Sequence, residues 1–82
     1  MIIYSAWSAK TCDLAYFTKK ESAINEAVQY VKDCCNTYML GEATANTMIA
    51  QLKVEGRAYY FDEALQTNID IASVDVVEVS EE

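Results

Sequence analysis

Histidine and proline are both absent from this chain, and glycine occurs only twice in its 82 residues. Without histidine, the chain lacks the commonest general base and the commonest metal ligand of proteins. Two isolated glycines cannot form a glycine-rich phosphate-binding loop. The paired C-x₂-C spacing of structural zinc sites and the D-x-D-x-D-G pattern of calcium loops are also missing. We therefore expect no catalytic residues, no metal site and no cofactor, and a binding protein rather than an enzyme.

Cysteine is odd in number and poorly placed for disulfides. Cys12, Cys34 and Cys35 include two adjacent residues, whereas secreted disulfide frameworks use an even number of separated cysteines. No segment reaches the ~18 apolar residues that span a bilayer, and the first ten residues do not resemble a signal peptide. These features predict reduced thiols, no membrane contact and a cytoplasmic location.

Composition predicts one compact domain over residues 1–82, with residues 80–82 as a frayed acidic tail. The hydrophobic fraction is 52%, and a chain of this size buries roughly 60% of its unfolded surface.

Residues 2–8 alternate as a strand, with Ile3, Ser5 and Trp7 on one side and Ile2, Tyr4 and Ala6 on the other. Residues 14–17 predict a second strand that pairs with the first in a hairpin.

A helix should run from about Lys19 to Asn36, because apolar residues recur there at helical spacing. The Thr18–Glu21 pattern matches a capping box, and Gly41 is expected to close the exit. Residues 46–61 predict a second hairpin that turns at Glu55-Gly56 and pairs Leu52 with Tyr59 and Ala50 with Phe61. A helix over residues 43–54 is the competing interpretation.

A short helix capped by Asp62 is expected over residues 62–66, and the β-branched residues 73–79 predict a final strand. The predicted order is therefore β-β-α-β-β-(short α)-β. This order indicates a two-layer α+β fold, in which a small, mostly antiparallel sheet packs against one main helix.

The charge of the chain is concentrated at one end. Residues 1–61 hold six acidic and six basic side chains, whereas residues 62–82 hold seven carboxylates and no lysine or arginine, so the net charge of −7 belongs to the last quarter. This balance opposes direct binding of nucleic acid, although Tyr16-Phe17 and the aromatic residues 59–61 could form a stacking platform. The alternative is that these aromatic residues pack in the core and on the sheet.

Two functions are compatible with this acidic end. Carboxylates along a strand lie ~6.5–7 Å apart on one face and could imitate phosphates for a basic, nucleic-acid-handling protein partner. A regular strand, however, would point Asp75 and Glu78 to opposite faces. The expected contact residues are Asp62, Glu63, Asp70, Asp75 and Glu78, with Tyr60 as an aromatic anchor. In the alternative, acidity serves only solubility and the sheet self-associates as a homodimer or structural module.

In size, charge and lack of catalytic groups, the chain resembles the inhibitors that bacteriophages and plasmids direct against host defence enzymes. These include anti-CRISPR, anti-restriction and uracil-glycosylase inhibitor proteins. The resemblance implies an inhibitor that blocks a basic nucleic-acid-binding enzyme, in some cases by DNA mimicry. No motif assigns the chain to one of these families, so the resemblance identifies no functional residues.

Overall fold

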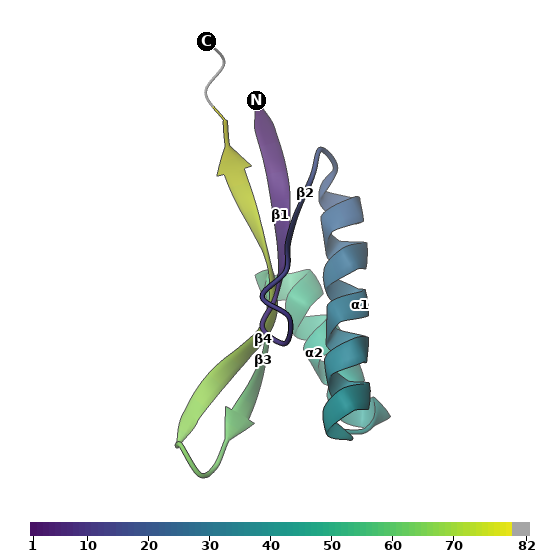
Figure 1. Cartoon of the computed structure of the whole chain (residues 1–82), viewed down its shortest axis with the longest axis vertical. Helices are drawn as coiled ribbons and strands as arrows, with labels where there is room; N and C mark the ends of the chain where they lie inside the picture. The colour runs from purple at the N-terminus through teal and green to yellow at the C-terminus, as the bar shows by residue number, and fades with distance from the viewer. Residues whose placement is uncertain (80–82) are drawn as a thin grey trace.

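Four strands form one antiparallel sheet in the order β2-β1-β4-β3, and two helices lie on one face of it (Figure 1). The computed structural model describes residues 1–79; the tail expected at residues 80–82 lies outside them. The elements are β1 (Ile2–Ser8), β2 (Leu14–Phe17), α1 (Lys20–Tyr38), α2 (Glu42–Glu55), β3 (Arg57–Asp62) and β4 (Thr67–Glu78). The predicted two-layer α+β class is therefore confirmed, with two helices in the second layer instead of one.

The first 38 residues fold as the sequence predicts, apart from the helix caps. Lys19 is the N-cap of α1 and makes no side-chain cap hydrogen bond, so the capping box expected at Thr18 does not form. At the other end, Met39 adopts a left-handed conformation and its N–H donates to the Cys35 carbonyl. Gly41, which was expected to close α1, instead precedes α2 as its N-cap.

The prediction of a strand over residues 46–54 is wrong, because this segment belongs to α2. Ala45, Met48 and Leu52 are its buried residues, and their spacing of three and four places them on one helical stripe. The alternation of Met48, Ala50, Leu52 and Val54 had favoured a strand, but Ala50 and Val54 are exposed. The competing interpretation, a helix over residues 43–54, matches the structure.

Gly56 has the predicted positive φ, but it ends α2 and does not turn a hairpin. A Cβ on Gly56 would lie 3.2 Å from the Val74 carbonyl oxygen, while the Val74 N–H donates to the Gly56 carbonyl at 2.8 Å. The expected pairs of Leu52 with Tyr59 and Ala50 with Phe61 do not form. β3 pairs instead with β4, where Tyr59 faces Asp70 and Phe61 faces Asn68.

The segment expected as a short helix is the turn of the β3–β4 hairpin. The Asp62 carboxylate accepts hydrogen bonds from the Ala64 and Leu65 N–H groups at 2.9 and 3.1 Å, so Asp62 caps a turn and not a helix. β4 begins at Thr67 and runs for 12 residues, six residues earlier than the expected final strand. Its pairing with β3 contains a register shift between Ala58 and Tyr59, and Ile71 is the extra residue of this bulge.

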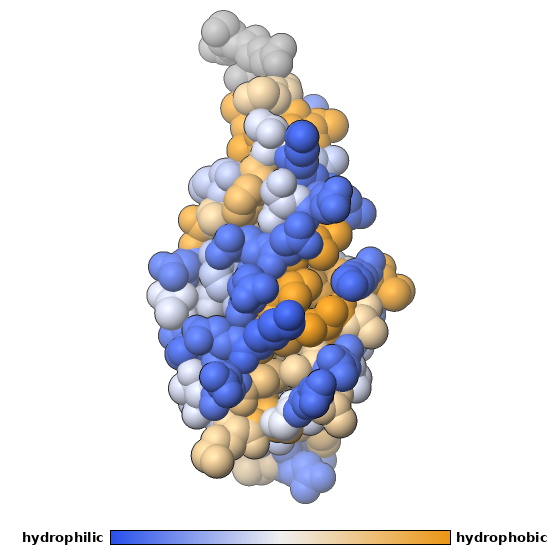
Figure 2. Space-filling model, turned by 90° about the vertical axis from the view of Figure 1, so that its right-hand side faces the viewer, coloured by the Kyte–Doolittle hydropathy of each residue, from blue (hydrophilic) through white to orange (hydrophobic). Residues whose placement is uncertain are grey.

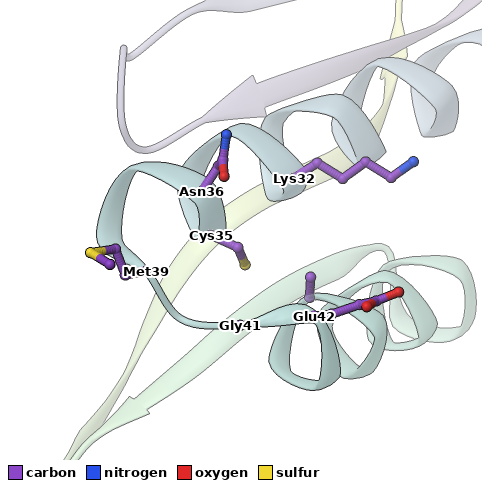
Figure 3. Close-up of a pocket in the computed structure, with 7 residues that line it drawn as sticks. Lys32, Cys35, Asn36, Met39, Gly41 and Glu42 are labelled. Carbon is purple, nitrogen blue, oxygen red and sulfur yellow. The ribbon is translucent and has the colours of Figure 1, made fainter.

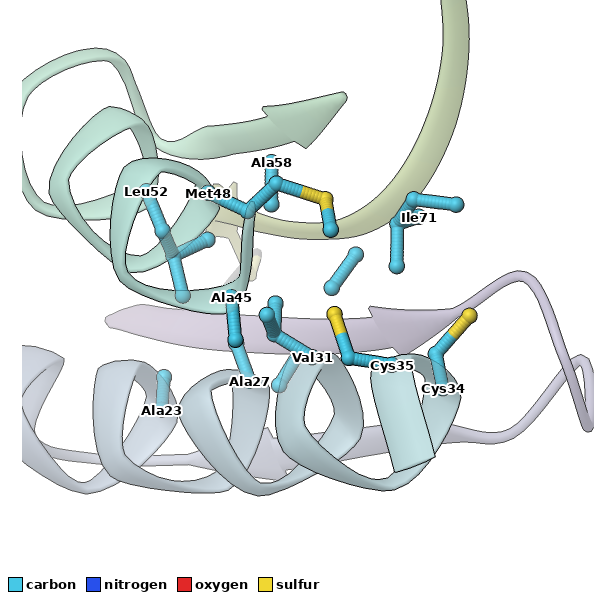
Figure 4. Packing of buried hydrophobic residues seen from close by; sticks show 12 residues of the cluster. Ala23, Ala27, Val31, Cys34, Cys35, Ala45, Met48, Leu52, Ala58 and Ile71 are labelled. Atoms are coloured by element: carbon cyan, nitrogen blue, oxygen red, sulfur yellow. The ribbon is translucent and has the colours of Figure 1, made fainter. Parts of the chain in front are cut away.

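The core between the helices and the sheet is built largely from small residues. Met48 and Leu52 of α2 point into the same interior as Val31 and Cys35 of α1 (Figure 4). Half of the buried hydrophobic residues are alanines: Ala6, Ala23, Ala27, Ala45, Ala58 and Ala72. Small side chains on the facing surfaces let the helices lie close to the sheet.

The molecule is elongated, with principal extents of 47 × 23 × 23 Å. The β3–β4 hairpin projects at one end, and the N-terminus and the end of β4 lie at the other (Figure 1). Within residues 1–79, neither helix combines the length and the apolar character that crossing a membrane requires.

Candidate protein-binding surface

The face of the sheet opposite α1 and α2 carries no second layer (Figure 1), and we call it the uncovered face. Residues that pair directly across antiparallel strands point to the same side. The pairings of Ser5 with Tyr16 and Asp75, and of Trp7 with Leu14 and Ser73, place these residues together on the uncovered face. Ile3 pairs with Val77 on the same side.

The two faces of the sheet differ in the size of the side chains at their centres. Ala6, Ala58 and Ala72 lie on the face that the helices cover, each with 0% exposure. On β1, β2 and β4 the uncovered face carries five large apolar side chains, Ile3, Trp7, Leu14, Tyr16 and Val77, and Tyr59 and Phe61 of β3 lie on the same side. Leu14 and Tyr16 are 51% and 56% exposed. One-sided antiparallel sheets normally alternate apolar residues inward with polar residues outward, so this face departs from the usual pattern of a solvated surface.

The bulge at Ile71 brings two acidic residues to the uncovered face. Asp70 and Asp75 are five residues apart and would point to opposite faces of a regular strand. The extra residue shifts the alternation, so that Asp70 pairs with Tyr59 on the same side as Asp75. Arg57 also lies on this side, since it pairs with Ser73.

Arg57 forms an ion pair with Asp70. An Nη of Arg57 donates to Asp70 Oδ1 at 2.7 Å, and the guanidinium carbon lies 5.5 Å from the centre of the Tyr59 ring. The hydrogen bond to Asp70, followed by its charge, raises the pKa of Arg57 above its ordinary value. Within the described residues, Asp75 takes part in no ion pair.

The structure divides the six predicted contact residues among three places. Asp70 and Asp75 share the uncovered face, whereas Tyr60 and Glu78 alternate onto the side that carries the helices, where they pair with Ile69 and Ile2. Asp62 and Glu63 lie at the hairpin end of the molecule. A single straight row of carboxylates is therefore not present among residues 1–79, although acidic residues follow β4 along its length.

A hollow of about 630 Å³ lies between the end of α1 and the start of α2 (Figure 3). The hollow is lined by Lys32, Cys35 and Asn36 of α1 and by the loop before Glu42. The Cys35 thiol points toward it. Burial is the main cause that raises the pKa of the Cys34 and Cys35 thiols, which keeps both protonated near neutral pH and poorly nucleophilic.

A smaller hollow of about 210 Å³ lies where α1 begins, beside the end of α2 and β4. Figure 2 shows the helical side of the molecule, where hydrophilic side chains flank a band of hydrophobic ones. Over the described part of the chain, no three His, Cys, Asp or Glu side chains are grouped closely enough to hold a metal ion. The Cys35 thiol and the Glu42 carboxylate both line the larger hollow, but no hydrogen bond joins them within the described residues.

No protein-family model, no curated protein and no solved structure matches this chain.

Sequence reasoning did not name Leu14 as a candidate contact residue, and it considered Tyr16 only as part of a stacking platform for nucleic acid. The alternation of β1 did place Ile3, Ser5 and Trp7 on one side. The other side of β1, with Tyr4 and Ala6, is apolar as well, so the strand alone could not tell which side the helices would cover. The signal available in the sequence was that aromatic and aliphatic residues occur on both sides of these first two strands.

Proposed function

We propose that this chain is an acidic, non-catalytic binding protein, and that it inhibits a basic, nucleic-acid-handling protein by docking on its charged groove. The observation that carries the proposal is the uncovered face, where five large apolar side chains lie on the side of the sheet without helices. Contiguous apolar surface of this kind on a small protein marks an interaction site. Trp and Tyr are also the residues that contribute most to interface binding energy.

Charge supports a basic partner over a second copy of the chain. No lysine or arginine follows Arg57 in the sequence, and Arg57 is already paired with Asp70. Asp75 lies among the apolar residues of the uncovered face, so a second copy would place like charge against like charge. A partner with lysines and arginines would gain both steering and specificity from the same residues.

Nucleic-acid-handling proteins are the basic partners that an acidic inhibitor would most directly block, since their grooves bind phosphates. The carboxylates that accompany β4, from Asp62 and Glu63 at the hairpin end to Glu78 at the other end, support this form of the proposal. An anti-defence inhibitor of the phage or plasmid type is the most specific version. In it, apolar contact on the uncovered face supplies affinity, and the acidic side chains exclude nucleic acid.

Self-association is the second candidate, because the same apolar face also suits another copy. Sedimentation at micromolar concentration separates the two. We expect a monomer across this range, and a dimer that Leu14→Ala/Tyr16→Ala dissociates would favour the alternative.

The main experiment is affinity capture from a lysate of the organism that carries the gene, at low and then high salt. We expect the wild-type chain to retain a basic protein that Leu14→Ala/Tyr16→Ala loses, and that added duplex DNA displaces. The matched control is Tyr38→Ala/Val54→Ala, which removes two side chains that are 61% and 86% exposed and lie on α1 and α2. Equal capture by both double variants, or capture that DNA does not affect, would refute the proposal.

A further inference from the structure

Three residues form a row across the uncovered face. Ser5 on β1 pairs on one side with Tyr16 of β2 and on the other side with Asp75 of β4. Neighbouring strands lie ~4.8 Å apart, so a group placed above Ser5 would lie about one strand spacing from both the Tyr16 side chain and the Asp75 side chain.

Ser5 is unusual for a residue on a face without a second layer, because it is only 5% exposed. Larger side chains surround it: Tyr16 and Asp75 across the strands, and Ile3 and Trp7 two residues away along β1. Its hydroxyl makes no hydrogen bond within residues 1–79. Among the described residues no fully buried side-chain oxygen lacks a partner, so the unpaired Ser5 hydroxyl oxygen remains accessible to a group placed above the row.

The chain itself contains an occupied version of this arrangement. On the same face, the Arg57 guanidinium donates to Asp70 at 2.7 Å and lies 5.5 Å from the centre of the Tyr59 ring. A β4 carboxylate and a tyrosine thus hold one arginine. Asp75 and Tyr16 supply the same two groups a short distance along the sheet, but the described chain supplies no cation between them.

We propose that an arginine side chain of the basic partner occupies the position above Ser5, between Asp75 and Tyr16. Its guanidinium would donate to the Asp75 carboxylate and to the Ser5 hydroxyl oxygen while it stacks against the Tyr16 ring. This inference rests on the proposed function, and it names the side chain that the uncovered face recognises.

The chemistry of the row selects arginine. Covering the face with an apolar surface would desolvate the Asp75 carboxylate without compensation, which is costly. A second copy would bring another carboxylate. Arginine fits better than lysine because its planar guanidinium donates several hydrogen bonds in fixed directions and stacks on aromatic rings.

The test uses arginine amide and lysine amide as probes in an NMR titration of the ¹⁵N-labelled full chain. We expect arginine amide to shift the amide signals of Ser5, Tyr16 and Asp75 most, and to bind the Asp75→Asn variant about tenfold more weakly. Glu42→Gln is the matched control, because it removes an exposed carboxylate at the start of α2, on the helical side. Asp75→Ser replaces Asp75→Asn if the latter loses the dispersed spectrum of the folded chain.

Three results would overturn the inference: equal affinity of wild type and Asp75→Asn, equal affinity for the two amides, or shifts spread evenly over all carboxylates. The outcome is separable from that of the proposed function. Capture of a partner that needs Leu14 and Tyr16 but tolerates Asp75→Asn would refute the arginine position alone. Arginine amide binding at Asp75, without any face-dependent capture, would refute the proposed function alone.

Discussion

The covered and uncovered faces of the sheet differ most at their centres, since the larger side chains of the covered face, such as Tyr4, Phe17 and Val74, pack against a cluster of alanines. The covered face is lined by alanines that are completely buried, and the uncovered face carries Trp7, Tyr16 and three large aliphatic side chains. Small residues on the covered face allow two helices to pack closely on a short sheet. The difference indicates that the fold is stabilised mainly on one side of the sheet, while Leu14 and Tyr16 remain exposed on the other.

This division can be tested most strongly at Met48, the largest fully buried side chain of the core. Met48→Ala should lower the free energy of unfolding by about 3 kcal/mol, because it removes buried surface and leaves a cavity. Leu14→Ala on the uncovered face, where Leu14 is half exposed, should cost much less. Urea denaturation of both variants measures this, and equal losses would show that the two faces contribute alike to stability.

Enlarging a buried alanine should also destabilise the fold, but through overpacking and not through a cavity. Ala27 has 0% exposure on the face of α1 that packs against the core. Ala27→Leu should therefore destabilise by about 1–3 kcal/mol through overpacking, while Ala43→Leu at an exposed position of α2 should be nearly neutral. Thermal unfolding of the pair would show the contrast. A stabilised Ala27→Leu chain would mean that the helices do not pack closely against the sheet.

Gly56 connects α2 to β3, and its substitution tests how tightly this connection approaches β4. Gly56→Ala should cost about 1–2 kcal/mol, since an L-residue disfavours the left-handed conformation and its Cβ would lie 3.2 Å from the Val74 carbonyl. Gly41→Ala is the control, because Gly41 also has a positive φ but a Cβ there would have no neighbouring atom within 4 Å. Chemical denaturation should rank Gly56→Ala as the more damaging, and the reverse order would show that the approach to β4 is unimportant.

The smallest expected effect is a pH dependence that originates in the covered core. Burial raises the pKa of the Cys34 and Cys35 thiols above the ordinary value of 9.0. The folded chain therefore holds these protons more tightly than the unfolded chain does. The stabilisation is fully present below the ordinary value and is lost as pH rises through the folded pKa.

Stability measured from neutral pH to just above 9.0 should therefore decline in the wild type and decline less in Cys34→Ala/Cys35→Ala. The comparison stops below the range where Tyr30 and Tyr59 contribute, since their pKa values are raised above 10.0. Cys12 is exposed and Cys12→Ala serves as the control, with the wild-type slope. If stability declined with pH equally in the double variant and in the wild type, the buried thiols would not be the cause of the decline.

Sequence reasoning succeeded where local patterns had one solution. The apolar stripe of α1 runs through Ala27, Val31 and Cys34, and these residues are buried as expected. In α2 the same reasoning failed, because Met48 and Leu52 fit a helical stripe and also an alternating strand. Tertiary packing decided between the two, since Ala45, Met48 and Leu52 together bury one face of a helix.

Only part of the candidate surface could be predicted from the sequence. Asp70 and Asp75 were named as contact residues, but their common face depends on the bulge at Ile71, which no local pattern indicated. The pairing of Asp70 with Arg57, 13 residues away, likewise arises from the β3–β4 register. That Leu14 and Tyr16 are exposed on the face without helices is a result of the tertiary structure.

By itself, the sequence determined the two-layer class, the concentration of negative charge in the last quarter and the alternation that groups Ile3, Ser5 and Trp7. These properties depend on composition and on neighbours within a few residues. Only the tertiary structure decided which side of the sheet became the interior. Both sides of β1 are apolar, and close packing of α1 and α2 is possible only on the side where Ala6, Ala58 and Ala72 leave room for them.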